Sequence, residues 1–175
     1  MRSRLVLVLS SVIISSLPAQ TAASKYQPSF DNPRGQELVA VLVSSSHCIG
    51  NSFPGFLASV DRMNSSLASQ SSRAGVAFVS VGVATDWEPD SGYAYLKSLS
   101  NFNEFIVGRN WFNLGAAHYV WADSASKPVE PQVILLERST TMDSAGVRIS
   151  RDRVLARYLG ADAIVSWVKQ GAPRP

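Results

Sequence analysis

The sequence is poor in cysteine: Cys48 is the only cysteine among its 175 residues. An internal disulfide is therefore excluded, and the fold must be stabilised by its core alone. A lone thiol is either buried and inert or available for reaction, and the sequence leaves both interpretations open. Histidine is also scarce, with only His47 and the distant His118. Because Cu(I) prefers more sulfur ligands than this chain offers, we expect no metal site, and we expect no cofactor.

Charged residues are few as well, at 17% of the chain, and no cluster of Lys and Arg with interleaved aromatic residues is present. The formal net charge of +3 includes Arg2 and Arg4. Without these two arginines, 14 basic residues face 13 acidic ones, a balance of about +1. This charge argues against nucleic-acid binding. The chain also lacks a G-x-S-x-G motif, so nothing in it indicates a serine hydrolase.

The N-terminal apolar run, residues 5–17, is interrupted by serines and is shorter than the roughly 17 to 25 residues of a membrane-spanning helix. It follows two arginines and precedes Pro18 and a small polar stretch, which is the order of a cleavable secretory signal. We therefore expect an exported protein, periplasmic or secreted, without a stable membrane anchor and monomeric. The predicted organisation is a signal peptide over 1–23, a linker or N-terminal arm over 24–36 and one domain over 37–175.

Continuous aliphatic runs predict three strands buried on both faces, at Leu38–Val43, Val76–Ala84 and Gln132–Glu137. Between the first two, apolar residues at helical spacing predict a helix from Phe53 to about Gln70. Such a strand–helix–strand unit is parallel, with a right-handed crossover. Weaker patterns predict a helix capped by Asp90, a short strand at 105–107, a mixed helical segment at 108–121 with Leu114 on its apolar side, a strand at 147–149 and a final helix capped by Asp162.

The loops after the first two strands emerge at the same carboxyl edge of the predicted sheet, where open α/β folds place their sites. Cys48 lies in the first loop, and Asp86 and Trp87 lie in the second. These residues form the candidate site. An ordinary turn with a packed indole is the simpler interpretation of Asp86 and Trp87.

The order of strand, cysteine loop, helix, strand, helix, proline, strand, strand and helix resembles the thioredoxin-like superfamily. The resemblance predicts an α/β fold, a thioredoxin-like domain with a central mixed β-sheet flanked by helices. The segment 82–121 also resembles uncharacterised exported bacterial thioredoxin-like proteins. The matching segments span nearly the whole mature chain and read LVAVLV at 38–43, HCIGN at 47–51, GVAFVSVGVA at 75–84 and EPQVILLE at 130–137.

The resemblance implies roles for individual residues. Cys48 stands at the nucleophile position before the first long helix, and a helix N-terminus favours a thiolate. His47 would modulate this thiol when protonated, unless it is simply a solvated loop histidine. Pro131 stands at the position of the cis-proline that faces the cysteine, leaving the backbone of Glu130 exposed to a substrate. Asn51 occupies the position of the missing resolving cysteine, so glutathione or another protein's thiol would have to release a mixed disulfide.

Two classes of function remain open. The first is a monothiol thiol–disulfide oxidoreductase that forms mixed disulfides through Cys48 with protein or peptide partners. A thiol sealed from solvent would count against it. The second is a non-catalytic module that binds a peptide or protein in a groove formed by Cys48, Trp87 and Pro131. A peroxidase is less well supported, because Ser44 or Ser45 stands where that group carries a threonine.

Overall fold

The computed structural model describes residues 35–123, 126–143, 146–150 and 152–175. The predicted signal peptide and all but the last two residues of the predicted arm lie outside the described residues. The chain divides into two units, 1–32 and 33–175, and everything that follows concerns the second. None of the described helices is both long enough and apolar enough to cross a membrane.

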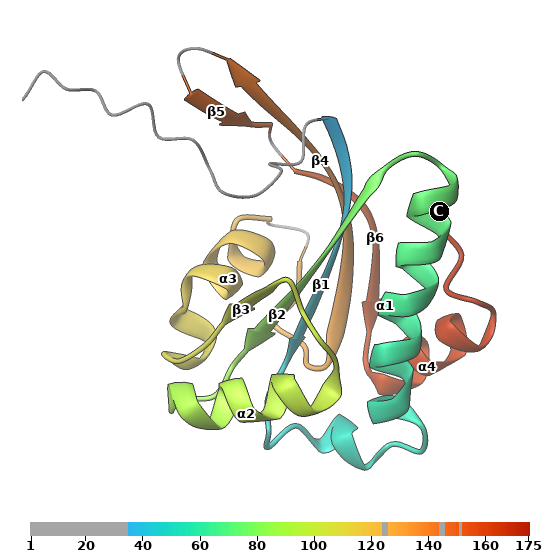
Figure 1. Ribbon diagram of the computed structural model, residues 1–175. Coiled ribbons are helices and arrows are strands. Elements are labelled where there is room, and N and C mark those ends of the chain that lie inside the picture. The colour runs from blue at the N-terminus through green and yellow to red at the C-terminus, as the bar shows by residue number, and fades with distance from the viewer. Residues whose placement is uncertain (1–34, 124–125, 144–145, 151) are drawn as a thin grey trace, which may run out of the picture. The chain divides into compact units, whose positions relative to one another are not determined.

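The described residues form a six-stranded sheet with helices packed on both faces (Figure 1). Three short turns, η1 (Ile49–Ser52), η2 (Asn110–Phe112) and the π-helical η3 (Ala117–Trp121), supplement the regular helices. The strands and α-helices, in chain order, are β1 (Gly35–Ser44), α1 (Phe56–Arg73), β2 (Ala77–Ala84), α2 (Pro89–Leu99), β3 (Glu104–Ile106), α3 (Leu114–Ala116), β4 (Gln132–Asp143), β5 (Gly146–Ile149), β6 (Arg153–Leu159) and α4 (Ala161–Lys169).

The sheet is mixed and has β1 near its centre. β2 pairs with β1 in parallel, and β4 pairs with β1 on the other side in the antiparallel sense. The free edge of β4 then pairs with β6 along its first half and with β5 along its second half, both antiparallel. The order β2-β1-β4-β6, with a helix after each of β1, β2 and β6, is the thioredoxin-like fold. The predicted fold class is confirmed.

The core has two layers because β1 is covered on both faces. Leu38, Ala40 and Leu42 point to one side, where they pack with residues of α1, α2 and α4. Val39, Val41 and Val43 point to the other side, toward η3. The ribbon in Figure 1 shows α1 and α4 on one side of the sheet and α3 on the other. A strand buried on both faces reads as a continuous aliphatic run, which explains why the sequence pattern of β1 is so plain.

Several sequence-based boundaries differ from the structure. The helix predicted from Phe53 begins at Phe56, and the first strand begins at Gly35, inside the predicted arm. Asp90 and Asp162 do not cap their helices. Each lies in the first turn, where its charge favours the helix dipole, while Glu88 and Gly160 are the N-cap residues.

The later part of the chain differs from the sequence-based prediction at β6 and at Leu114, whereas the predicted strand at 147–149 is present. The sequence pattern did not reveal β6, the fourth strand of the thioredoxin-like core, because the exposed Arg153 and the half-buried Arg157 interrupt its apolar pattern. The predicted strand at 147–149 corresponds to β5, which pairs only with the far half of β4. Leu114 does not belong to an apolar packed face, since it is 80% exposed.

Candidate functional site

The carboxyl ends of β1 and β2 meet at one edge of the sheet, as predicted. Asp86, just after β2, accepts hydrogen bonds from Ser46, just after β1. The backbone N–H of Ser46 lies 3.2 and 3.3 Å from the two carboxylate oxygens, and the Ser46 hydroxyl lies 2.5 Å from one of them. Asp86 is 4% exposed. It lies beside the cysteine loop, as predicted, and its buried carboxylate holds this loop through the hydrogen bonds from Ser46.

The segment before β4 joins the same edge through Glu130. One carboxylate oxygen accepts a hydrogen bond from the Ser45 hydroxyl at 3.2 Å, and the other accepts one from the Thr85 hydroxyl. Ser45 and Thr85 are buried, whereas Glu130 is half-buried. Side-chain hydrogen bonds therefore join three segments: the loop after β1, the loop after β2 and the segment before β4.

The Glu130–Pro131 peptide bond is cis, as the resemblance implied. The carbonyl of Pro131 accepts a hydrogen bond from the N–H of Gly160 at 2.8 Å. On its other side the proline ring packs against Gly50. A Cβ atom on Gly50 would lie 2.4 Å from Cδ of Pro131 and 3.3 Å from Sγ of Cys48, so no larger residue fits between them. Cys48 and Pro131 thus flank the same glycine.

The Cys48 thiol is 5% exposed. Its pKa is raised, first because burial disfavours the thiolate and further because of the Glu130 carboxylate. Hydrogen bonds from the backbone of Gly50 and Asn51 and from Ser44 act in the opposite direction without outweighing these causes. The thiolate expected from the first long helix stays a prediction, and the direction of this pKa shift does not support it. Cys48 precedes the four-residue η1, and α1 begins only at Phe56, so the dipole of the long helix does not reach the sulfur.

Asn51, at the resolving position, braces the cysteine loop. Its side-chain N–H groups donate to the carbonyls of Ser45 and Ser46 at 3.0 and 3.2 Å. Its side-chain oxygen accepts a hydrogen bond from the Tyr95 hydroxyl at 2.6 Å, and this hydroxyl also lies 2.9 Å from that of Ser44. Burial raises the pKa of Tyr95, which keeps its hydroxyl protonated as a donor. No sequence signal linked Tyr95 to this loop.

His47 is exposed, and the groups that shift the pKa of Cys48 do not include its imidazole. This agrees with a solvated loop histidine. Trp87, in contrast, does not have the packed indole of an ordinary turn. It is 65% exposed and lies next to Phe112, which is 68% exposed, with a ring-centroid distance of 6.5 Å. Sequence reasoning did not single out Phe112, because its proximity to Trp87 depends on the fold of the 108–112 loop.

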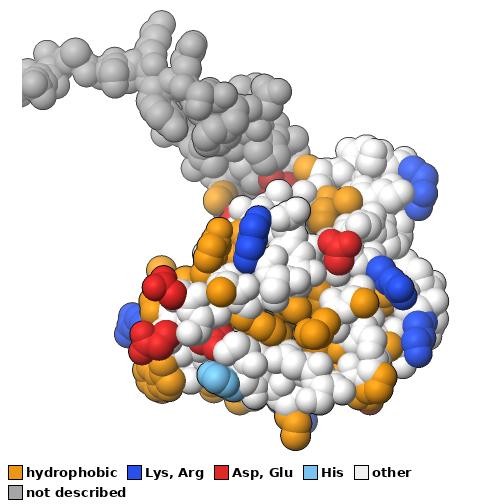
Figure 2. All heavy atoms as spheres, turned by 60° about the horizontal axis from the view of Figure 1, so that its bottom comes forward, with side chains coloured by type: hydrophobic (Ala, Val, Ile, Leu, Met, Phe, Trp, Pro, Cys, Tyr) orange, Lys and Arg blue, Asp and Glu red, His pale blue; other side chains and the backbone are white. Residues whose placement is uncertain are grey.

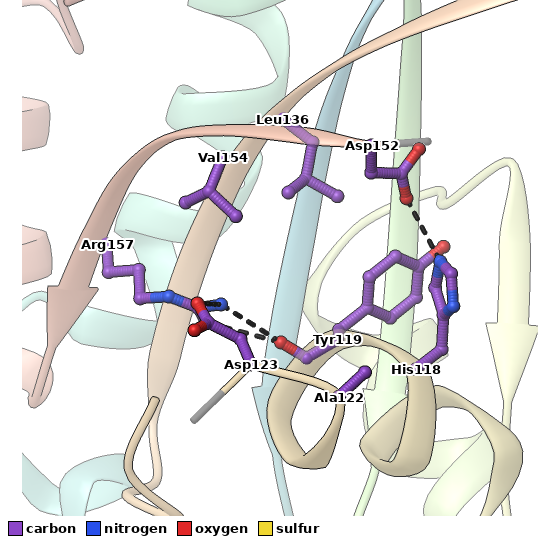
Figure 3. Close-up of a pocket in the computed structure, with 8 residues that line it drawn as sticks. All are labelled: His118, Tyr119, Ala122, Asp123, Leu136, Asp152, Val154 and Arg157. Carbon is purple, nitrogen blue, oxygen red and sulfur yellow. Dashed lines mark hydrogen bonds and ion pairs between the residues drawn. The ribbon is translucent and has the colours of Figure 1, made fainter. Parts of the chain in front are cut away.

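A cavity of about 370 Å³ lies away from this edge, between η3 and the strands β4 and β6 (Figure 3). Its charged side chains are paired. Arg157 donates a hydrogen bond to the Asp123 carboxylate at 2.9 Å. The Asp152 carboxylate accepts two hydrogen bonds from Arg138, at 2.9 and 3.1 Å, and lies 3.0 Å from Nε2 of His118. Burial alone would raise the pKa of Asp152, but Arg138 and His118 outweigh it and the pKa is lowered. None of the residues predicted for the site lines this cavity. Its ion pairs join His118 of η3 and the adjacent Asp123 to Asp152 and to Arg157 of β6.

Within the described part of the chain, no group of His, Cys, Asp and Glu side chains is arranged to hold a metal ion. No protein-family model matches the sequence, and no curated protein matches it. Solved structures similar to the chain include yeast Sco1, at 18% identity over 77% of this chain and 85% of that chain, with a TM-score of 0.37. A second is BsSco, a member of the Sco family of cytochrome c oxidase assembly proteins in which a disulfide switch was identified. It is 16% identical over 78% of this chain and 80% of that chain, with a TM-score of 0.34.

Proposed function

We propose that the protein is an exported, monomeric, non-catalytic thioredoxin-fold module that binds an extended segment of a partner protein. The binding surface would be the edge described above, here called the cis-proline edge and defined by residues 45–53, 85–90, 108–114, 129–131 and 159. The observation that carries this proposal is the apolar surface at this edge. Seven of the eleven large apolar side chains exposed in the described residues belong to these segments or to the first turn of α1: Ile49, Phe53, Leu57, Trp87, Phe112, Leu114 and Leu159.

These exposed side chains surround a framework that is polar and buried. Ser45, Thr85 and Asp86 are each 4% exposed and are hydrogen-bonded within the protein. Figure 2, which turns the lower end of Figure 1 toward the viewer, shows hydrophobic side chains gathered across the middle of this face. An exposed apolar patch that is rimmed by polar residues is typical of an interaction site.

The backbone beside the proline supports an extended partner. Within the part of the chain that the structure describes, the N–H and C=O groups of Glu130 have no hydrogen-bond partner. The neighbouring carbonyl of Pro131 is already paired with Gly160. A partner segment in β conformation would satisfy the Glu130 groups, and its side chains would meet the apolar surface.

A monothiol role for Cys48 is the second candidate. The position of its sulfur across Gly50 from Pro131 favours this role. The 5% exposure and raised pKa of the thiol disfavour attack on a disulfide, because the reactive form is the thiolate. We therefore assign Cys48 to the support of the loop.

An array of unrelated ten-residue peptides, probed with the mature protein and with three variants, tests the proposal. Cys48→Ser should retain binding, and Trp87→Ala should weaken it by about tenfold. Ile149→Ala is the matched control, since Ile149 is 63% exposed and lies on β5, and it should bind as the unmodified protein does. Peptide retention that requires Cys48 and is reversed by a reducing agent would replace the binding module with the monothiol.

A further inference from the structure

We infer that the segment recognised at the cis-proline edge is basic as well as apolar, with a Lys or Arg side chain placed over Trp87. This inference rests on the proposed function and specifies the chemistry of its partner. It starts from an imbalance of charge around an exposed aromatic pair.

The segments of the edge carry four carboxylates, those of Asp86, Glu88, Asp90 and Glu130. Arg109 is their only arginine, and they contain no lysine. Among the described residues, Glu88 and Asp90 are exposed and have no ion pair. Glu130 is held by hydroxyl groups of Ser45 and Thr85 rather than by a cation. With four carboxylates and one arginine, the segments of this edge carry a net negative charge.

In the sequence D-W-E-P-D the exposed Glu88 directly follows Trp87 and the exposed Asp90 lies three residues beyond it, whereas the Asp86 carboxylate is buried against Ser46. An exposed indole attracts an ammonium or guanidinium group through its π-face, and nearby carboxylates strengthen the preference for a cation. The tilted arrangement of Trp87 and Phe112, with an interplanar angle of 37°, leaves a second aromatic surface beside the first for an apolar side chain. Together these groups match a segment in which basic and apolar side chains alternate or adjoin.

The aromatic pair is also pre-positioned. Gly108, Arg109 and Asn110 have φ angles of 81°, 58° and 53°, a run of three left-handed residues of which two are not glycine. The backbone N–H of Asn110 donates to the carbonyl of Asp86 at 3.1 Å, which joins this loop to the residue before Trp87. Backbone held in a sparsely populated region persists only when the surrounding structure fixes it, and such positions concentrate at functional sites. An aromatic pair that is already ordered loses little conformational entropy when a partner binds.

The test uses four fluorescein-labelled ten-residue peptides and the whole mature protein. The peptides combine Leu and Phe with either Lys or Glu, and Ser and Gly with either Lys or Glu. Fluorescence anisotropy should show the basic apolar peptide binding about tenfold more tightly than the acidic apolar peptide and the basic polar peptide. Raising the salt from about 20 mM to about 200 mM should reduce this preference, because exposed charges are screened.

Variants of the acidic residues locate the effect. The double change Glu88→Gln and Asp90→Asn should remove most of the preference for the basic apolar peptide while leaving the acidic apolar peptide's affinity unchanged or improved. Glu104→Gln, which removes an exposed carboxylate from β3, is the matched control and should keep the preference. Equal binding of the acidic and basic apolar peptides would overturn this inference and leave the proposed function standing, as would equal binding of the two basic peptides. Binding of neither apolar peptide would overturn both.

Discussion

Gly50 and Pro131 pack so closely that a methyl group on Gly50 would lie 2.4 Å from Cδ and 2.9 Å from Cγ of the proline. Gly50 belongs to η1, after β1, and Pro131 stands immediately before β4. The backbone conformation of Gly50 does not require glycine, since its φ is not positive. The close approach of the proline ring is what excludes a side chain here.

Gly50→Ala should therefore destabilise the domain by about 1 to 3 kcal/mol, the usual cost of adding volume to a packed site. Urea denaturation followed by tryptophan fluorescence measures the change. Ser52→Ala, at an exposed position of the same turn, should stay within about 0.5 kcal/mol of the unmodified protein. An unchanged midpoint for Gly50→Ala would contradict the packing described here.

The raised pKa of Cys48 predicts slow alkylation. At pH 8 iodoacetamide should modify the folded protein more slowly than the urea-unfolded chain, and the folded rate should rise only at higher pH. Burial raises the pKa of the thiol in the folded protein. The contribution of the protonated thiol to folding stability is therefore complete below the unfolded pKa of about 8.5 and is lost as the pH rises through the folded pKa. Folded-state alkylation as fast as that of the unfolded chain would disprove the buried thiol.

Glu130→Gln should shift the alkylation profile of Cys48 to lower pH, since the Glu130 carboxylate is one cause of the raised pKa. The amide keeps the shape of the side chain and removes its charge. Glu104→Gln is the control and should leave the profile in place, because Glu104 is not among the groups that shift this thiol. A profile that Glu130→Gln does not move would exclude an electrostatic contact between the two residues.

Asp152→Asn should lower stability at pH 7 by roughly 3 kcal/mol, because Arg138 would lose its charged partner. Both side chains of this ion pair are 12% exposed. The pKa of Asp152 is lowered in the folded state, so the stabilisation is present above the unfolded pKa of about 3.9 and is lost as the pH falls. Denaturation at pH 7 and at pH 3 should therefore show a smaller difference between variant and unmodified protein at the lower pH. An equal difference at both would contradict the charge pairing.

Tyr95→Phe should cost about 1 to 2 kcal/mol, since it removes the donor to Asn51 and the contact with Ser44. Thermal unfolding monitored by circular dichroism measures the loss. Tyr93→Phe is the matched control on the same helix. Its ring is 48% exposed and packs against Phe105, and this contact does not need the hydroxyl. Equal melting temperatures for Tyr95→Phe and Tyr93→Phe would show that the bridge to Asn51 contributes nothing.

The parts of the fold that could be predicted from the sequence are those whose environment leaves a simple pattern. β1, β2 and the first half of β4 are buried on both faces, or nearly so, and appear as aliphatic runs. β6 lies at the edge of the sheet and carries Arg153 and Arg157, which form ion pairs with Glu137 and Asp123. A strand with such a mixed pattern cannot be distinguished from a polar loop by periodicity alone.

Only part of the candidate site could be predicted from the sequence. The meeting of Cys48, Asp86 and Pro131 at one edge follows from strand order, and strand order follows from the buried runs. The burial of the thiol, the exposure of Trp87 and the contact of Asn51 with Tyr95 depend on how separate loops pack, and this packing has no periodic signal. The expected effect of the helix dipole on Cys48 also depends on this packing, because the residue is buried and the four-residue η1 lies between it and α1.

Asp86 makes different contacts through its two ends: its carboxylate holds the Ser46 amide, and its backbone carbonyl holds the Asn110 amide. A single buried residue thus links the loop that carries Cys48 to the loop that carries Phe112. The positions of the two loops therefore depend on the same residue, and replacing Asp86 would remove a hydrogen-bond acceptor from the cysteine loop while changing the support of the loop that carries Phe112.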